Sequence, residues 1–157
     1  MSKFFRALIV LLAVSFAPFL TGTSCHPKPK SDMPVVSLKV DGQEVWAEVA
    51  NKEATRSSGL MFRQEMDWNN GMLFVFPDTA MRAFWMKNTL IPLSVAFMDE
   101  KGNIINTEEM IPQSEQSVWS KGPAKYVLEM NGGWFGKEGV KPGDKMEGVL
   151  TAPKAEN

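Results

Sequence analysis

Residues 84–99 constrain the fold more than any other part of the chain. They form two apolar runs separated by the polar insert Lys87-Asn88-Thr89, and the second run ends at the carboxylate Asp99. Exposed loops rarely contain so many large apolar side chains, and core strands rarely contain charged or amide side chains in their middle. We therefore expect this stretch to contribute to a packed core and to hold polar groups at one particular place.

The first 24 residues are typical of an export signal and not of a folded domain. Lys3 and Arg6 form a short basic start, and an almost uninterrupted apolar run covers residues 7–20. This run is shorter than the roughly 20 residues that a membrane-spanning helix needs, but it suits the core of a signal peptide. We expect residues 1–24 to be a signal peptide and the protein to be exported.

The only cysteine, Cys25, directly follows this leader. The arrangement resembles the lipobox of bacterial lipoproteins, with Ser24 and Thr23 fitting the two preceding positions and Gly22 standing where an aliphatic residue is usual. The resemblance implies lipidation of Cys25, a membrane anchor and a place in the cell envelope, facing the periplasm or the cell surface. The alternative is an ordinary secretory signal cleaved near Ser24, which leaves a free thiol in an oxidising compartment.

Residues 25–34 contain three prolines and two lysines, a composition that predicts an extended tether. The only histidine, His26, lies in this tether, so the domain that follows has no histidine for a catalytic triad, a general base or a metal site. Two of the 17 basic residues belong to the leader, which leaves 15 basic against 18 acidic residues and a net charge of −3. No basic stripe is visible, and a nucleic-acid partner is not expected.

Alternating apolar and polar residues on both sides of Asp41-Gly42 predict a β-hairpin formed by residues 35–40 and 43–50. Asn51 is expected to cap a short helix that continues to Ser58. Residues 134–138 predict one further helical turn. Additional strands are expected at residues 72–76, 83–86, 94–98, 104–110, 125–130 and 145–151.

These elements place residues 35–157 in a single domain of the α+β class, mostly β, with two short helices. Several of the expected strands are apolar on both faces. Such strands predict a compact, curled or barrel-like antiparallel sheet in preference to an open one with a solvated face.

Five segments, in order, carry a resemblance to a known family: GLMFR at 59–63, GMLFVF at 71–76, FWMKNTLIPL at 84–93, YVLEMN at 126–131 and GD at 143–144. Together they resemble the bacterial and archaeal family called domain of unknown function 192, over about residues 35–151. The resemblance implies a compact, mostly β, often exported domain and brings no established activity. Ser94 stands where members commonly have an aspartate, so a family chemistry that uses this carboxylate is absent here or depends on Asp99.

Polar residues embedded in apolar runs are the candidate site residues. Lys87 and Asn88 could brace an irregular loop, since asparagine side chains mimic backbone turns, or they could contact an anion and orient a carbonyl group. A buried Lys87 would need a charged partner, and Glu129, which also lies between apolar residues, is the expected one. Lys87, Asn88 and Glu129 are therefore the candidate catalytic residues.

The candidate ligand-binding residues are Arg63, Trp85, Lys87, Asn88 and Asn131. Arg63 could bind a carboxylate or phosphate of a ligand through both of its terminal nitrogens. Alternatively, it could pair with a carboxylate of the protein and fix the exit of the preceding helix.

Methionine is abundant, with 11 residues in the chain, and thioethers favour Cu(I). Five of them lie close together in sequence: Met61, Met66, Met72, Met81 and Met86. Methionine is also the usual filler of irregular cores, and neither a metal nor another cofactor is expected.

The function that these observations favour is a non-enzymatic, envelope-anchored module that binds a small ligand or a protein partner. The alternative is a small histidine-free enzyme that acts on an anionic or carbonyl substrate through Lys87, Asn88 and Glu129. Cu(I) binding by methionines is a third, minor alternative.

Overall fold

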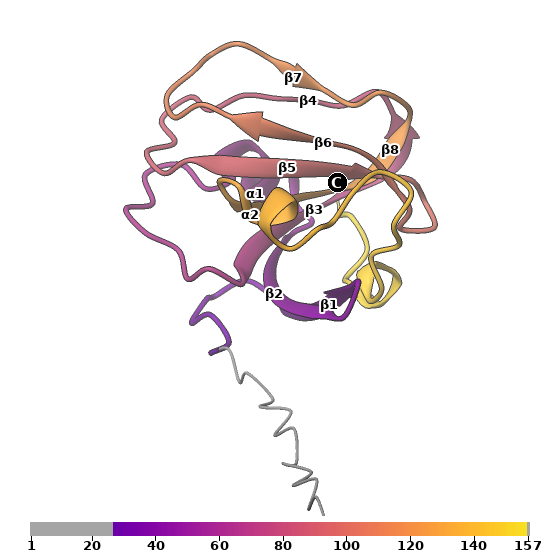
Figure 1. Cartoon of the computed structure of the whole chain (residues 1–157). Coiled ribbons are helices and arrows are strands. Elements are labelled where there is room, and N and C mark those ends of the chain that lie inside the picture. Colours follow the sequence, from indigo (N-terminus) through magenta and orange to yellow (C-terminus); the bar gives the residue numbers. More distant parts are fainter. Residues whose placement is uncertain (1–26, 157) are drawn as a thin grey trace, which may run out of the picture.

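The computed structural model describes residues 27–156, so the predicted signal peptide, Cys25 and His26 lie outside the described residues. One six-stranded sheet has the strand order β1-β2-β3-β8-β5-β6, and a separate two-stranded sheet pairs β4 with β7. Figure 1 shows β5 and β6 above the short helix α2, and β1 and β2 below it. The elements are β1 (Val35–Val40), β2 (Gln43–Ala50), α1 (Glu53–Ser58), β3 (Asn70–Ala80), β4 (Ala83–Phe84), β5 (Leu93–Met98), β6 (Ile104–Met110), β7 (Val118–Trp119), β8 (Ala124–Asn131), α2 (Trp134–Lys137) and the 3₁₀ helix η1 (Val149–Thr151).

The predicted hairpin joins β1 and β2, and its two turn residues, Asp41 and Gly42, have φ angles of 47° and 80°. Positive φ at both central positions gives the turn a twist that matches the twist of the strands. The next pair, β2 and β3, is parallel, whereas the expected sheet was antiparallel throughout. A parallel pair needs a crossover connection, and α1 with the loop after it supplies one. The remaining pairs of the large sheet are antiparallel.

The large sheet is apolar on both faces, because successive side chains of a strand point to opposite sides. Leu73, Ala96 and Leu128 pack on one face with Trp134 and Phe135 of α2, and we call this the Trp134 core. Phe74, Val95, Phe97 and Val127 pack on the other face with Leu60 and Met86, and we call this the Phe97 core. The predicted class, a mostly β single domain of the α+β type with two short helices, is confirmed.

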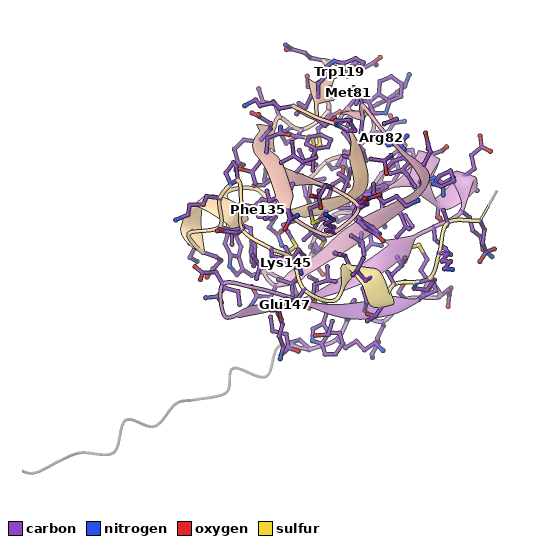
Figure 2. The ribbon with its side chains drawn as sticks, turned by 90° about the vertical axis from the view of Figure 1, so that its right-hand side faces the viewer. Met81, Arg82, Trp119, Phe135, Lys145 and Glu147 are labelled. Carbon is purple, nitrogen blue, oxygen red and sulfur yellow. The ribbon has the colours of Figure 1, made fainter. Side chains whose placement is uncertain are left out.

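The sheet stays open, but the segment before η1 spans the gap between its two edge strands. Lys39 of β1 and Glu147 exchange backbone hydrogen bonds of 3.1 and 2.7 Å. A few residues earlier, the Ile104 amide of β6 donates to the Asp144 carbonyl at 2.9 Å. Figure 2 shows Lys145 and Glu147 along this segment. The domain is therefore curled almost to closure.

The strand expected at residues 145–151 is wrong, because this segment makes only isolated bridges and then turns into η1. Gly148, with φ of 91°, explains the break. A Cβ atom at this position would lie 2.6 Å from the Ser37 carbonyl oxygen, so the backbone passes directly against β1 and turns away from it.

The start of α1 also differs from the prediction. The helix begins at Glu53 with Lys52 as its N-cap residue, and the Asn51 side chain instead donates to the Lys154 carbonyl at 2.8 Å. Asn51 thus fixes the C-terminal tail and not the helix. Within residues 27–156, no helix has the length and apolar character that crossing a membrane requires.

The described part of the predicted tether lies against the domain. The Lys28 ammonium stands over the Trp46 ring, 5.8 Å from its centroid, and the Ser31 hydroxyl donates to Glu48 at 2.7 Å. The Val49 amide donates to the Pro34 carbonyl at 2.7 Å. The chain therefore contacts β2 before β1 begins.

Candidate functional site

Glu129 lies near the centre of the large sheet. Its strand, β8, runs between β3 and β5, and its register neighbours are Met72 and Val95. Glu129 is 4% exposed, and no group among residues 27–156 donates a hydrogen bond to its carboxyl or pairs with its charge. Burial raises the pKa of Glu129 to about 8, because an apolar environment disfavours the ionised form. The carboxyl is therefore mostly protonated at neutral pH.

A cavity of about 370 Å³ lies over Glu129, a volume within the range of small-molecule sites. Side chains from α1 and the loop after it, from β3, and from β4 and the loop after it form its walls. The lining residues are Glu53, Arg56, Ser57, Ser58, Gly59, Leu60, Met61, Phe74, Phe76, Ala83, Phe84, Trp85, Thr89 and Glu129.

Aromatic rings form a rigid wall of this cavity. Phe84 packs edge-to-face against Phe74, Phe76 and Phe97, with ring centroids 4.9, 6.3 and 5.9 Å apart. The Arg82 guanidinium lies 3.9 Å from the centroid of the Phe76 ring. These contacts hold the rings in place without a ligand, so this wall of the cavity is formed in advance.

Arg56 of α1 contributes a fixed positive charge to the lining. Its Nη1 atom donates to the carbonyl oxygens of Asn51 and Val75 at 2.6 and 3.1 Å, and no carboxylate of the described residues pairs with it. The sequence prediction missed Arg56, because α1 buries none of its residues and lacks an apolar face that would mark one side of the helix as important.

The structure separates Lys87 and Asn88 from Glu129, and the predicted Lys87–Glu129 ion pair is wrong. The Lys87 ammonium lies 3.8 Å from Glu115, and both side chains are largely exposed. It also stands 5.2 Å from the centroid of the Trp85 ring. The reason is that β4 ends at Phe84, so the polar insert lies in a surface loop and not in a strand beside β8.

Asn88 is exposed, and its backbone connects two loops. It has a φ of 55° and accepts a hydrogen bond of 2.9 Å from the amide of Phe62, which itself has a φ of 64°. Thr89 is the only member of the polar insert that is buried and lines the cavity. The insert therefore braces the loops around the cavity and supplies one hydroxyl-bearing side chain to its wall.

Arg63 is already occupied by a carboxylate of the protein. Its Nη1 and Nη2 atoms donate to the two carboxylate oxygens of Glu48 at 2.5 and 2.7 Å. Burial by itself raises the pKa of Glu48, but hydrogen bonds from Arg63 and Ser31 and the charge of Arg63 outweigh it and hold the pKa below its ordinary value. Arg63 therefore fixes the loop after α1 to β2.

The two remaining candidates for ligand binding differ in position. Asn131 follows Glu129 on the same face of β8, and its side-chain amide donates to the carbonyl oxygens of Asp67 and Trp68 at 2.8 and 3.2 Å. It thus braces the loop that leads into β3. Trp85 lines the cavity and is 46% exposed, so it remains available to a ligand.

Ser94 is buried on the opposite face of the sheet from the cavity. Its hydroxyl lies 2.8 Å from both carboxylate oxygens of Glu109, and the Gly133 amide donates to Ser94 at 2.7 Å and to Glu109 at 2.9 Å. Glu109 thus places a carboxylate directly beside Ser94. Asp99, by contrast, accepts hydrogen bonds from Lys101 and Asn103 inside a hairpin turn.

The five clustered methionines do not surround one point. Met72 and Met86 are buried in the Phe97 core, whereas Met81 is 52% exposed. Met81, which is labelled near the top of Figure 2, directly follows β3. Met72 and Met81 are separated by most of a strand, or about 30 Å at roughly 3.3 Å per residue. Among the described residues, no group of three or more His, Cys, Asp or Glu side chains is placed to hold a metal ion.

Comparison with known proteins agrees with this fold. The model of the family domain of unknown function 192, described as "Uncharacterized ACR", matches residues 36–148, and the chain belongs to this family. No curated protein matches the chain.

Two solved structures are similar to this one. A protein from Sinorhizobium meliloti 1021, described as a candidate transcription regulator, is 35% identical over 77% of this chain and 98% of its own, with a TM-score of 0.72. A protein of unknown function from Novosphingobium aromaticivorans DSM 12444 is also 35% identical, over 76% of this chain and 89% of its own, with a TM-score of 0.69.

Proposed function

We propose that the domain binds a small organic ligand in the cavity over Glu129. The observation that carries the proposal is a buried carboxyl group that has no partner among the described residues and faces a preformed space. A buried polar group without a hydrogen bond costs about 1–3 kcal/mol of stability. A ligand that hydrogen-bonds Glu129 would supply a partner for this group, and a few placed polar groups of this kind fix the orientation of a ligand in its pocket.

Ligand binding is favoured over catalysis by Lys87, Asn88 and Glu129, because the first two residues belong to a surface loop and only Glu129 reaches the cavity. It is favoured over docking of a protein partner because the unpartnered carboxyl lies at the base of a hollow. A small molecule reaches such a group more easily than a protein surface does.

The leader of residues 1–24 and the cysteine that follows support an envelope location for this module. In this proposal a lipid on Cys25 holds the domain at a membrane, and the short tether keeps it near the surface. Cys25 and the leader are outside the described residues, so this part of the proposal depends on the sequence alone.

A fragment screen tests the proposed cavity. Uniformly labelled domain is mixed with a set of small organic fragments, and chemical-shift changes are mapped onto the structure. Binders are expected to shift the resonances of Phe74, Phe84, Trp85 and Thr89 together, because these residues line one space.

Ala83 lines the cavity and is exposed, so an indole introduced by Ala83→Trp can occupy part of the space where a fragment would bind. This substitution should abolish the chemical-shift changes. The matched control is Met81→Trp, which adds an indole at an exposed position outside the lining and should leave binding unchanged. Fragments that bind elsewhere, or that bind the Ala83→Trp variant equally well, contradict the proposal.

A further inference from the structure

Among the polar groups that line the cavity, Glu129 and Arg56 differ most in character. Glu129 comes from the sheet, is almost fully buried and is neutral at pH 7, so it offers one O–H donor. Arg56 comes from α1, is half-buried and carries a charge that no carboxylate of the described residues neutralises. The hydrogen bonds of Arg56 go to the backbone of Asn51 and Val75, and no hydrogen bond or ion pair joins Arg56 to Glu129. The two groups therefore address different ends of a ligand.

The charges around the cavity disfavour a cationic ligand. Aromatic faces attract cations, but here protein cations already stand over them: Arg56 and Arg82 over Phe76, and Lys87 over Trp85. Glu53, on the exposed surface of α1, is the only other carboxylate in the lining. Arg82 and Lys87 are paired with Asp78 and Glu115, so Arg56 is the cation of the lining that has no carboxylate partner among the described residues and can receive an anion.

We propose that the ligand is an elongated organic anion with a carboxylate that binds Arg56, an apolar body along the phenylalanine wall and a carbonyl oxygen that accepts from Glu129. Phe74, Phe76 and Phe84 supply the apolar contact between the two polar ends. The Nη1 atom of Arg56 is used by backbone carbonyls, and its other nitrogens have no partner among the described residues and bind the carboxylate. This inference names the ligand class for the proposed function above and depends on it.

Oxo-carboxylates with the carbonyl at the penultimate carbon serve as probes, in chain lengths of about five to ten carbons that suit the cavity volume. Each is compared with the parent carboxylate, which lacks the carbonyl, and with its methyl ester, which lacks the charge. Dissociation constants come from the chemical shifts of Thr89 and Trp85. The best oxo-carboxylate is expected to bind about tenfold more tightly than either comparison compound, the effect of one well-placed hydrogen bond or ion pair.

Two sets of variants test which residue binds the carbonyl group of the ligand and which binds its carboxylate. Glu129→Gln keeps an N–H donor, so the oxo-carboxylate should keep its advantage over the parent acid, whereas Glu129→Leu should lose it. Arg56→Gln should lose only the advantage of the acid over the ester. The Arg56→Gln test compares the affinities of the acid and the ester for the same variant. A general loss of stability in this variant therefore does not change the result.

The pH dependence provides an independent measurement. In the wild type, the advantage of the oxo-carboxylate over the parent acid should disappear as the pH rises above 8, because the Glu129 donor ionises. The other charged groups facing the cavity are Arg56 and Glu53, with Arg82 and Lys87 over the aromatic rings. The Glu129→Gln variant should keep its advantage at high pH, which separates the contribution of Glu129 from theirs.

Equal binding of acids, esters and parent compounds, or tighter binding of the matching amines, overturns the assigned ligand class but leaves a small-molecule site in place. If no compound in the series or in the fragment set shifts the cavity resonances, both the ligand class and the proposed function are wrong.

Discussion

Glu48 and Glu129 are two buried carboxyl groups with opposite environments. Glu48 accepts hydrogen bonds from Arg63 and Ser31, which hold its pKa below the ordinary value in spite of burial. Glu129 has no such donors, and burial raises its pKa to about 8. Both residues lie in strands of the same sheet. The sheet and its loops thus supply hydrogen-bond donors to the carboxylate of Glu48 but none to the carboxyl of Glu129.

The stability of the protein should therefore fall as Glu129 ionises. Its pKa is about 8 in the folded state against 4.5 for an unperturbed side chain, so the folded state binds more protons between these values and loses stability as the pH rises through them. Wild-type protein should lose about 1 kcal/mol or more between pH 6 and pH 9 through this group, and Glu129→Gln should not. Urea unfolding at the two pH values measures both. An equal loss in wild type and variant would show that another group is responsible.

At the scale of elements, the position of Glu129 depends on the close approach of β3 and β8. Gly71 of β3 pairs with Met130, and a Cβ atom at Gly71 would lie 2.4 Å from the Glu129 carbonyl oxygen and 2.5 Å from the Met130 sulfur. Only glycine permits this separation of the two strands.

Gly71→Ala should consequently destabilise the domain by about 1–3 kcal/mol, the usual cost of overpacking a filled core. The matched control is Gly136→Ala in α2, where an added Cβ meets nothing within 4 Å. Thermal or urea denaturation of the two variants measures the difference. A Gly71→Ala variant that is as stable as Gly136→Ala would contradict the close packing of β3 against β8.

Backbone hydrogen bonds join the loops over the Phe97 core, and several of the residues that form them have positive φ angles. Phe62 and Asn88 both adopt positive φ and share one hydrogen bond, and the Gln113 amide donates to the Thr89 carbonyl at 3.0 Å. Asparagine tolerates this conformation, but for an aromatic residue such as Phe62 it is uncommon and has to be imposed by the surrounding structure. The three loops thus form a connected rim beside the cavity.

At the scale of the whole molecule, the domain and its proposed anchor are linked by a short segment that contacts β2 through Lys28, Ser31 and Pro34. The domain would then be held close to the membrane, with little slack in the tether.

Cys25→Ser tests this arrangement. If a lipid on Cys25 is the anchor, removing this thiol should release the mature protein from the membrane fraction, because the acyl chains that hold it are lost. Fractionation after a salt wash, with immunodetection, measures the release, and Ser24→Ala serves as a control that keeps the thiol. Retention of a Cys25→Ser variant from which the leader has been cleaved would exclude the lipid anchor.

Local sequence patterns were sufficient for the hairpin at Asp41-Gly42, for most of the strands and for a sheet that is apolar on both faces. These features depend on the alternation of side chains and on turn residues, which act over a few positions. The same reasoning marked Glu129 as a charged residue inside an apolar strand, and the structure places it under the cavity.

Which groups stand next to Glu129 was decided by the tertiary structure alone. The chain after α1 returns to make β3 parallel to β2, and α1 itself brings Arg56 to the cavity. The early end of β4 places Lys87 in a surface loop. Neighbours across a sheet depend on where each connection returns the chain, and residue-by-residue patterns do not contain that information. Short-range patterns were thus enough for most of the strands and for placing Glu129 inside one of them, whereas the absence of a partner for its carboxyl among the described residues depends on how the distant segments pack.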